Sequence, residues 1–308
     1  MKAVMPSAES TGTGNPSGQS RHIKAYLSLG AATLFWSSNV VAVKLAVQEM
    51  PPMATAALRV TLAAVTLLLI YTARGGRLRL RPGEWRTFLR LGLWGLAASF
   101  SFFTLGVHRT SVSHAVFVGA LTPLTVLLLA WLDGQERISP LRVGALLVSL
   151  AGVLLLALDR PPGGAGPNWQ GDLLVVGGVA CFAFYMVRGK SLAEAYPTLQ
   201  FNVYLFLAAA AWLFPLLCLE LARLPWEHVS WVGWTSLAYS ATVGSAGAYL
   251  AHYYSLRRIP ASRVAVFHYL QPPLGAALGF LFFPEVLTAR FLLGAALILT
   301  GVVVAEHR

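Results

Sequence analysis

Two polar residues inside one long apolar run are the strongest candidates for chemistry in this sequence. His268 and Gln271 lie three positions apart, directly before Pro272 and Pro273. Side chains three apart share a face of a helix, and polar groups inside a membrane span tend to face a cavity or a partner helix. We therefore expect His268 and Gln271 to line a path for a solute. Because proline removes a backbone donor, Pro272 and Pro273 predict a break in the helix beside them.

A second group of candidates lies in the first two apolar runs. Trp36 and Asn39 are three apart and could supply a stacking ring and an amide to a cavity wall; the alternative is a helix–helix hydrogen bond. Arg59 is the only arginine well inside an apolar run. A guanidinium is a fixed cation that grips a carboxylate with two hydrogen bonds. The alternatives for Arg59 are a brace for a neighbouring helix or a side chain that reaches the membrane surface.

Tyrosines supply the remaining candidates. Tyr249 and Tyr253 are four apart and share a face, close to the small-residue run 244–247, where a helix or a ligand can approach the backbone. Tyr185 lies in an earlier apolar run that is also rich in aromatic residues. Such strings more often pack together or mark the membrane interface. We nevertheless include Tyr185, Tyr249 and Tyr253 among the expected substrate-binding residues.

Composition decides the class of protein. Of 308 residues, 56% are hydrophobic and only 11% are charged, whereas soluble domains carry about 25% charged residues. The sequence therefore predicts an integral membrane protein that contacts the lipid bilayer and a small-molecule solute. The net charge of +11 does not indicate nucleic acid, because the basic residues fall in short segments between apolar runs. Hydrolase, ATP-binding and metal-binding motifs are missing from the sequence, so we expect no catalytic residue, no metal and no cofactor.

The apolar runs are long enough to cross a membrane, which takes about 20 helical residues. We predict an all-α integral membrane protein with ten transmembrane helices, at approximately 26–44, 53–72, 87–107, 113–132, 140–158, 171–188, 199–219, 231–254, 262–283 and 287–305. The predicted organisation is a disordered cytoplasmic tail at 1–25, a five-helix repeat at 26–158, a linker at 159–170 and a second five-helix repeat at 171–305.

A constant spacing relates the two halves. Residues recur at an offset of 149, and the first helix of each half aligns at an offset of 146. The pairs at 149 include Gly95 with Gly244, Arg109 with Arg258, Pro123 with Pro272, Glu136 with Glu285 and Gly152 with Gly301; at 146, Asn39 meets Tyr185. Duplication of an odd number of helices makes the second half enter the membrane from the opposite side, as two inverted repeats. Because Lys and Arg gather in alternate loops, we predict that both termini are cytoplasmic in a cell (inner) membrane.

This pattern resembles the drug/metabolite transporter superfamily, and within it the EamA-type permeases. The residues that carry the resemblance are Phe35-Trp-Ser-Ser-Asn39 followed by Lys44, Pro52 and Arg59 in helix 2, the Pro123 and Pro272 pair, and Glu136 and Glu285, each of which opens the last helix of its half. The resemblance implies a central cavity lined by helices 1–4 and 6–9. It also implies that helices 5 and 10 pack outside the cavity or at a subunit contact, and hence a homodimer through them.

We expect an exporter of a small organic metabolite, such as an amino acid or a related compound, that works by alternating access. Breaks at Pro123, Pro272 and Pro273 would act as hinges. One alternative is a sugar-phosphate or nucleotide-sugar carrier of the same superfamily, which would need basic residues at mid-membrane in helices 7–9, where the sequence has none. Another alternative is a non-transporting sensor or assembly protein. Since no acidic residue lies in the middle of a predicted span, proton coupling would have to use a histidine, and His268 is the candidate.

Overall fold

The computed structural model describes residues 16–135, 139–159, 168–223, 226–256, 258, 267, 270–286 and 288–306, and these ranges contain helices and turns but no strand. The first half comprises α1 (Pro16–Glu49), α2 (Pro52–Ala73), α3 (Trp85–Arg90), the π-helix η1 (Leu91–Ala97), α4 (Ala98–Arg109), α5 (Val112–Gly119), α6 (Thr122–Leu132) and α7 (Pro140–Ala157). The second comprises α8 (Trp169–Arg188), α9 (Lys190–Ala195), α10 (Thr198–Leu221), the 3-10 helix η2 (Trp226–His228), α11 (Trp231–Ala241), the π-helix η3 (Thr242–Gly247), α12 (Ala248–Leu256), α14 (Gln271–Phe282) and α15 (Ala289–Glu306).

Seven helical stretches within the described ranges are long and apolar enough to cross a membrane. They are Ile23–Glu49, Pro52–Ala73, Trp85–Arg109, Val112–Leu132, Pro140–Ala157, Trp169–Arg188 and Thr198–Leu221, with a shorter apolar helix at Ala289–Ala305. The chain is therefore an all-helical, multi-pass membrane protein. The count of ten spans and the inverted arrangement of the halves stay predictions.

The start of α1 differs from the prediction. This helix begins at Pro16, so residues 16–25, which were predicted to belong to a disordered tail, are helical. Hydropathy marks where the membrane core begins, whereas backbone hydrogen bonds can carry the same helix out into water. The N-terminal limit of the first span therefore does not mark the N-terminal limit of its helix.

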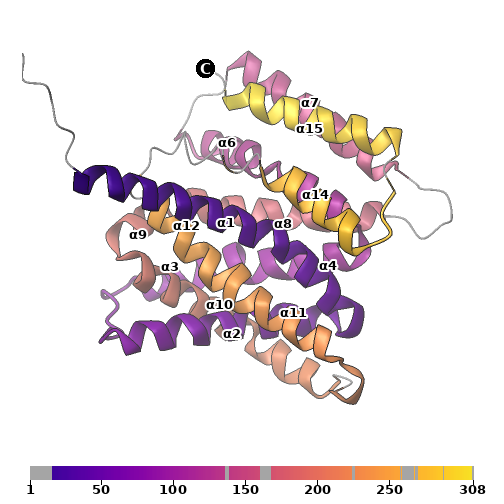
Figure 1. Cartoon of the computed structure of the whole chain (residues 1–308). Helices are drawn as coiled ribbons and strands as arrows, with labels where there is room; N and C mark the ends of the chain where they lie inside the picture. The colour runs from indigo at the N-terminus through magenta and orange to yellow at the C-terminus, as the bar shows by residue number, and fades with distance from the viewer. Residues whose placement is uncertain are drawn as a thin grey trace, which may run out of the picture.

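The bundle has two ends, which we call face A and face B. Face A is the end at which α1 begins, and face B is the end at which α1 stops at Glu49. In Figure 1 the beginning of α1 and the end of α15 both lie at face A, on the left of the view. The segments between α4 and α5, between α10 and α11 and between α14 and α15 lie at face B, on the right.

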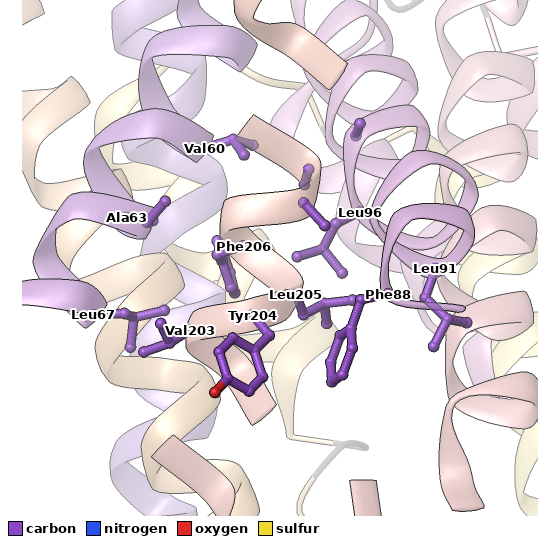
Figure 2. Packing of buried hydrophobic residues seen from close by; sticks show 14 of the residues in the cluster. Val60, Ala63, Leu67, Phe88, Leu91, Leu96, Val203, Tyr204, Leu205 and Phe206 are labelled. Carbon is purple, nitrogen blue, oxygen red and sulfur yellow. The ribbon is translucent and has the colours of Figure 1, made fainter. Parts of the chain in front are cut away.

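The largest apolar cluster joins helices from both halves. Figure 2 shows side chains of α2, of α3 with η1, and of α10 packed into one another. Leu67, Leu96, Leu205 and Phe206 are each 0% exposed in this cluster. Lipid tails are as apolar as these side chains, so close packing rather than exclusion from water favours the contact. The cluster fixes the position of α2, and with it the position of Arg59, the polar side chain that α2 carries next to Val60.

Helices α7 and α15 pair with each other along one edge of the bundle (Figure 1). A Cβ atom added to Gly152 would lie 2.6 Å from the carbonyl oxygen of Gly294, and one added to Gly301 would lie 2.1 Å from the Ser149 hydroxyl. That hydroxyl donates a hydrogen bond of 3.3 Å to the Ile298 carbonyl. Small residues thus allow the two backbones to touch. The predicted homodimer through these helices would have to use their other faces, where Leu147, Leu150, Leu154, Leu292 and Leu293 are exposed.

We expect Gly152→Ala to lower the melting temperature of the detergent-purified protein. The new methyl group must push α15 away from α7, and such overpacking costs about 1–3 kcal/mol. Gly144→Ala is the matched control on the same helix, because nothing lies within 4 Å of the added Cβ. Equal melting temperatures for the two variants would contradict the close packing of α7 on α15.

The predicted breaks beside the prolines coincide with helix boundaries. Helix 4 of the prediction is divided into α5, which ends at Gly119, and α6, which begins at Thr122 with Pro123 in its first turn. Helix α14 begins at Gln271 with Pro272 and Pro273 in its first turn. Proline is well suited to these positions, since the first amides of a helix have no intrahelical acceptor. The role of the three prolines as hinges stays a prediction.

Candidate functional site

An aromatic cluster occupies the middle of the bundle, where α1, α4, α8, α10 and α12 meet. The indole of Trp36 lies edge-on to Tyr249 with ring centroids 5.8 Å apart, and 5.0 Å from the ring of His252. The ring of Tyr249 also contacts Phe206, 5.3 Å away. Further contacts in the cluster come from Phe100, Phe182, Phe201, Tyr185 and Tyr253. The structure therefore brings together Trp36, Tyr185, Tyr249 and Tyr253, four of the predicted substrate-binding residues.

Two of these tyrosines meet through their hydroxyl groups. Tyr185 of α8 and Tyr253 of α12 share a hydrogen bond between their phenolic oxygens. The ring of Tyr185 stacks on Phe201, with centroids 6.2 Å apart. A phenol in an apolar interior needs such a partner, because an unpaired buried hydroxyl is costly. The two hydroxyl groups are therefore polar groups within the aromatic cluster, and either could hydrogen-bond a solute in place of the other hydroxyl.

Arg59 projects from α2 into the same region and is almost fully buried, with 4% of its surface exposed. Its Nε donates a hydrogen bond of 2.9 Å to the Ser245 hydroxyl. Its guanidinium carbon lies 4.3 Å from the centre of the Phe100 ring, a cation–π contact. Within the described ranges no Asp or Glu forms an ion pair with Arg59. The centre of the bundle therefore carries a buried positive charge with no carboxylate partner among the described residues.

Asn39 lies against the π-helix η3 of the other half. A Cβ added to Gly244 would be 2.2 Å from Asn39 Oδ1. That oxygen is buried and accepts no hydrogen bond within the described part of the chain. A buried amide oxygen without a donor is costly. Asn39 thus offers an acceptor for a solute, or for water that accompanies it.

The contact of Asn39 has a counterpart. A Cβ added to Gly95, on η1, would lie 2.5 Å from the Cβ of Tyr185 on α8. The sequence offsets align Gly95 with Gly244 and Asn39 with Tyr185. In each case the residue from the first helix of one half packs on a glycine in a π-helix of the other half. A π-helix is wider than an α-helix because its hydrogen bonds join residues five apart, and such segments are frequent at functional sites.

The two remaining predicted residues are described only in part. Gln271 begins α14, and its backbone carbonyl accepts a hydrogen bond of 3.4 Å from the Ser37 hydroxyl of α1. This contact joins the start of α14 to the helix that carries Trp36 and Asn39. His268 lies outside the described residues, so its expected place on the solute path stays a prediction.

A cavity of about 600 Å³ lies toward face A. It is lined by Arg74, Thr198, Leu199, Leu250, Tyr254 and Arg258. Leu250 and Tyr254 each follow a predicted site residue, Tyr249 or Tyr253, by one position, so the predicted pair faces the aromatic cluster while its neighbours face the cavity. Of the eight residues predicted from the sequence, the seven that the structure describes are not among those that line the cavity.

Face B is closed by polar contacts between distant segments. The backbone amide and hydroxyl of Ser230, at the start of α11, donate hydrogen bonds of 2.6 and 2.8 Å to Glu49 at the end of α1. Glu285 accepts from the backbone amides of Val112 (2.7 Å) and Ser113 (3.1 Å) at the start of α5, and also from the Ser113 hydroxyl. The first amides of α5 are thus satisfied by a carboxylate from another segment, which its helix dipole also favours.

Lys44 adds a third contact at face B. Its ammonium group donates to the carbonyl oxygens of Val107 (2.8 Å) and Thr110 (2.7 Å), at the end of α4. A cation at the C-terminal end of a helix is favourable because the last carbonyls have no intrahelical donor. Face B thus has three sets of such contacts, and a second cavity of about 420 Å³ also lies at this face, beside Arg109 and Trp169.

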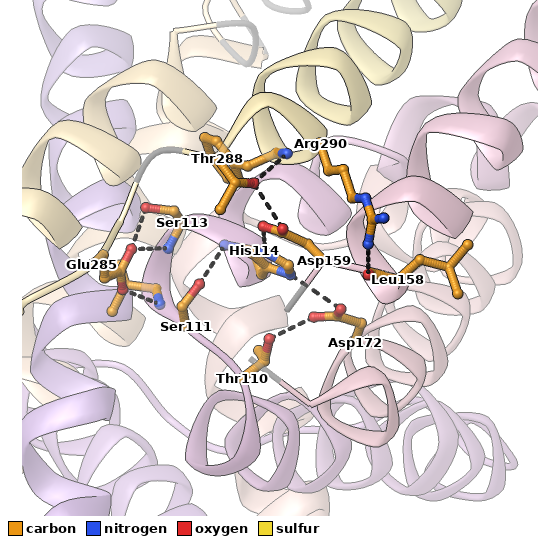
Figure 3. A network of polar contacts seen from close by, with 12 residues as sticks. Thr110, Ser111, Ser113, His114, Leu158, Asp159, Asp172, Glu285, Thr288 and Arg290 are labelled. Carbon is orange, nitrogen blue, oxygen red and sulfur yellow. Dashed lines mark hydrogen bonds and ion pairs between the residues drawn. The ribbon is translucent and has the colours of Figure 1, made fainter. Parts of the chain in front are cut away.

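Sequence reasoning missed a polar group beside these contacts. His114, Asp159 and Asp172 meet in the interior at face B, where Thr110 and Thr288 complete their hydrogen bonds (Figure 3). Each of the three has 3% or less of its surface exposed. All three residues lie near the ends of predicted spans, where a polar residue is expected to be exposed or to cap a helix. The only signal in the sequence was that His and Asp residues are frequent near these span ends.

The two halves of the chain each match a known protein family. The model of the EamA-like transporter family matches residues 23–158 and again residues 169–305. The chain belongs to the EamA-like transporter family. It is therefore a membrane transporter by family, and its resemblance to the drug/metabolite transporter superfamily is confirmed.

Relatives of similar length support the assignment to this family. An uncharacterized transporter of Archaeoglobus fulgidus is 27% identical over 93% of this chain and 100% of its own length. The uncharacterized transporter YyaM of Bacillus subtilis is 24% identical over 93% of this chain and 94% of its own. A solved crystal structure with 23% identity superposes with a TM-score of 0.64, covering 92% of this chain and 97% of that one, and so shares the fold.

Proposed function

We propose that this EamA-like transporter exports a small organic metabolite that carries a carboxylate, such as an amino acid or a related compound, across the cytoplasmic membrane by alternating access. The solute would bind in the aromatic cluster between the two halves. Arg59 would hold its carboxylate, and Trp36 and Tyr249 would contact its apolar part. Asn39 and the hydroxyl pair of Tyr185 and Tyr253 would hydrogen-bond its remaining polar groups.

The buried guanidinium of Arg59 is the observation that carries this proposal. A cation in a low-dielectric interior is stable only if it is paired or hydrogen-bonded. Among the described residues, Arg59 has one hydrogen bond, to Ser245, and a contact with an aromatic face, which leaves most of its five N–H donors for a ligand. A planar carboxylate matches the guanidinium fork with two parallel hydrogen bonds.

Alternating access draws support from the difference between the two faces. Face B is held by Glu49, Glu285 and Lys44, each bonded to a different segment, and the cavity of about 600 Å³ toward face A exceeds the one of about 420 Å³ at face B. With the predicted topology face A is cytoplasmic, so this conformation would receive the solute from the cell. The double match to the family and the paired contacts at Gly95 and Gly244 support two related halves that rock about the centre.

A sugar-phosphate carrier is the second candidate, and the cavity toward face A favours it. Arg74 and Arg258 both line this cavity, and Arg258 also lies over the ring of Tyr254, 3.7 Å from its centre. Two guanidinium groups would attract a phosphate ester as readily as a carboxylate. Both arginines lie toward the end of the bundle rather than beside the central cluster, so we assign them to attraction of an anion toward the cavity.

A ligand-stabilisation screen on the detergent-purified protein tests the solute class. Amino acids would be compared with the amines that they yield on loss of the carboxylate, and with sugar phosphates. A ligand at about 100 times its dissociation constant stabilises the folded state by about 2.7 kcal/mol. We expect amino acids, and not the matched amines, to raise the melting temperature. Stabilisation by sugar phosphates alone would favour the second candidate.

A further inference from the structure

His114, Asp159 and Asp172 form a buried polar trio at face B. The trio lacks one proton for its hydrogen bonds if the imidazole is neutral and both carboxylates are ionised. His114 Nδ1 lies 3.1 Å from Asp172 Oδ2, and its Nε2 lies 3.6 Å from Asp159 Oδ2. A neutral imidazole has one N–H donor and one lone pair. One of its nitrogens would therefore direct a lone pair at a carboxylate oxygen. An added proton, on the ring or on Asp159, removes this conflict.

The outer oxygens of the two carboxylates are already occupied. The Thr110 hydroxyl donates to Asp172 Oδ1 at 2.5 Å, and the Thr288 hydroxyl donates to Asp159 Oδ1 at 2.7 Å. These bonds fix both carboxylates with their free oxygens toward the ring of His114 (Figure 3). The ring itself stacks on Phe291, with centroids 5.7 Å apart. The proton thus has a rigid and enclosed position between three side chains.

Among the residues that the structure describes, charged groups on the surrounding elements do not replace this proton. Lys44 of α1 bonds to carbonyl oxygens at the end of α4, and Glu285 bonds to the start of α5. Arg290 of α15 donates to the Leu158 carbonyl at 3.1 Å, and Arg109, at the end of α4, is exposed. Within the described ranges, neither Asp159 nor Asp172 forms an ion pair with a lysine or arginine. With a protonated ring the trio carries a net charge of −1, and without it −2 in a buried site.

The trio also connects parts that must separate if face B opens. His114 lies on α5 of the first half, Asp172 lies on α8 of the second, and Asp159 follows α7. Thr288, directly before α15, ties Asp159 to the second half. Movement of one half against the other would pull the ring from at least one carboxylate and admit water. The interaction that retains the proton would then be lost.

We propose that His114, Asp159 and Asp172 form a proton-binding site that holds one proton while face B is closed and releases it when face B opens. The proposal rests on the alternating access proposed above and adds a proton to that cycle. It places the coupling group at face B, and not at His268. Because the proton binds the closed form better, by linkage a rise in pH favours the open form.

Hydrogen–deuterium exchange of the α5 amides in nanodisc-reconstituted protein, with no solute added, tests this site. After correction for the pH dependence of chemical exchange, the opening constant reports how often face B opens. In the wild-type protein we expect it to rise with pH by up to about tenfold per pH unit, the slope for release of one proton. The control His108→Gln, which alters an exposed histidine at the same face, should keep this dependence.

Two variants should abolish the pH dependence. His114→Gln removes the ring, and Asp159→Asn supplies an amide donor to a neutral ring, so that no added proton is needed. Asp159→Asn decides the matter if His114→Gln fails to fold. A flat profile for the wild-type protein, or an unchanged slope in a folded variant, would overturn the proposal. Because no solute is present, a pH-dependent opening together with a failed transport assay would leave the proton site standing and refute the solute proposal alone.

Discussion

Arg59→Met should remove carboxylate binding while leaving the melting temperature of the solute-free protein unchanged or higher. A hydrogen bond to a charged group contributes about 1.5–3 kcal/mol, so loss of the guanidinium should weaken solute binding by about 10- to 100-fold. Methionine fills a similar volume without a charge. Since the buried cation has no fixed carboxylate partner in the described ranges, removing its desolvation cost should not destabilise the fold.

This combination separates a solute site from a structural brace. If Arg59 mainly braced α2 against Ser245 and Phe100, the Met variant would melt at a clearly lower temperature. The measurement compares melting temperatures with and without a stabilising amino acid, in the wild-type protein and in Arg59→Met. Arg90→Met is the control for loss of a positive charge, because Arg90 is exposed at the end of α3. Normal stabilisation of Arg59→Met by the amino acid would exclude Arg59 from the site.

Gly244→Ala should destabilise the protein, and a second substitution, Asn39→Ala, should restore part of the loss. The added methyl group at Gly244 would overlap Asn39, whose Oδ1 would lie 2.2 Å away and whose Cβ would lie 2.8 Å away. Overpacking of this kind costs about 1–3 kcal/mol. Alanine at position 39 removes this oxygen, which accepts no hydrogen bond within the described residues. It keeps the Cβ that lies 2.8 Å from the added methyl group, so only part of the loss is recovered.

A double-mutant cycle on melting temperatures measures this coupling. Gly177→Ala is the matched control, because the nearest atom to its added Cβ is 3.6 Å away, on the Phe102 ring. Gly95→Ala, at the equivalent position, should behave like Gly244→Ala, since its added Cβ would meet Tyr185 at 2.5 Å. Additive effects of Gly244→Ala and Asn39→Ala would show that α1 and η3 do not pack as described.

Hydropathy and internal repetition predicted much of this architecture. The class of protein, most span limits and the breaks before Pro123 and Pro272 follow from apolar length and from the lost amide of proline. The aligned pairs Gly95 with Gly244 and Asn39 with Tyr185 were visible as sequence offsets. In the structure Gly244 packs on Asn39 and Gly95 packs on Tyr185, in each case across the two halves. The offsets alone did not indicate these contacts.

Contacts between the ends of helices could not be predicted in the same way. His114 and Asp172 lie near span limits, where the sequence is equally consistent with exposure to water, capping or burial. Their burial depends on how α5 meets α8, a contact between residues 58 positions apart. Arg59 illustrates a related limit, because its position inside an apolar run indicated burial of its side chain but not the absence of a carboxylate partner. Such facts depend on packing between helices, which hydropathy does not report.

Counterflow of labelled amino acids into proteoliposomes tests the central claim most directly. Vesicles preloaded with an unlabelled amino acid identified by the stabilisation screen should accumulate its labelled form when they contain the wild-type protein. Vesicles with Arg59→Met should not, at equal protein content and with normal melting behaviour. Absence of accumulation for every amino acid tested with folded wild-type protein, or equal accumulation with Arg59→Met, would contradict the account.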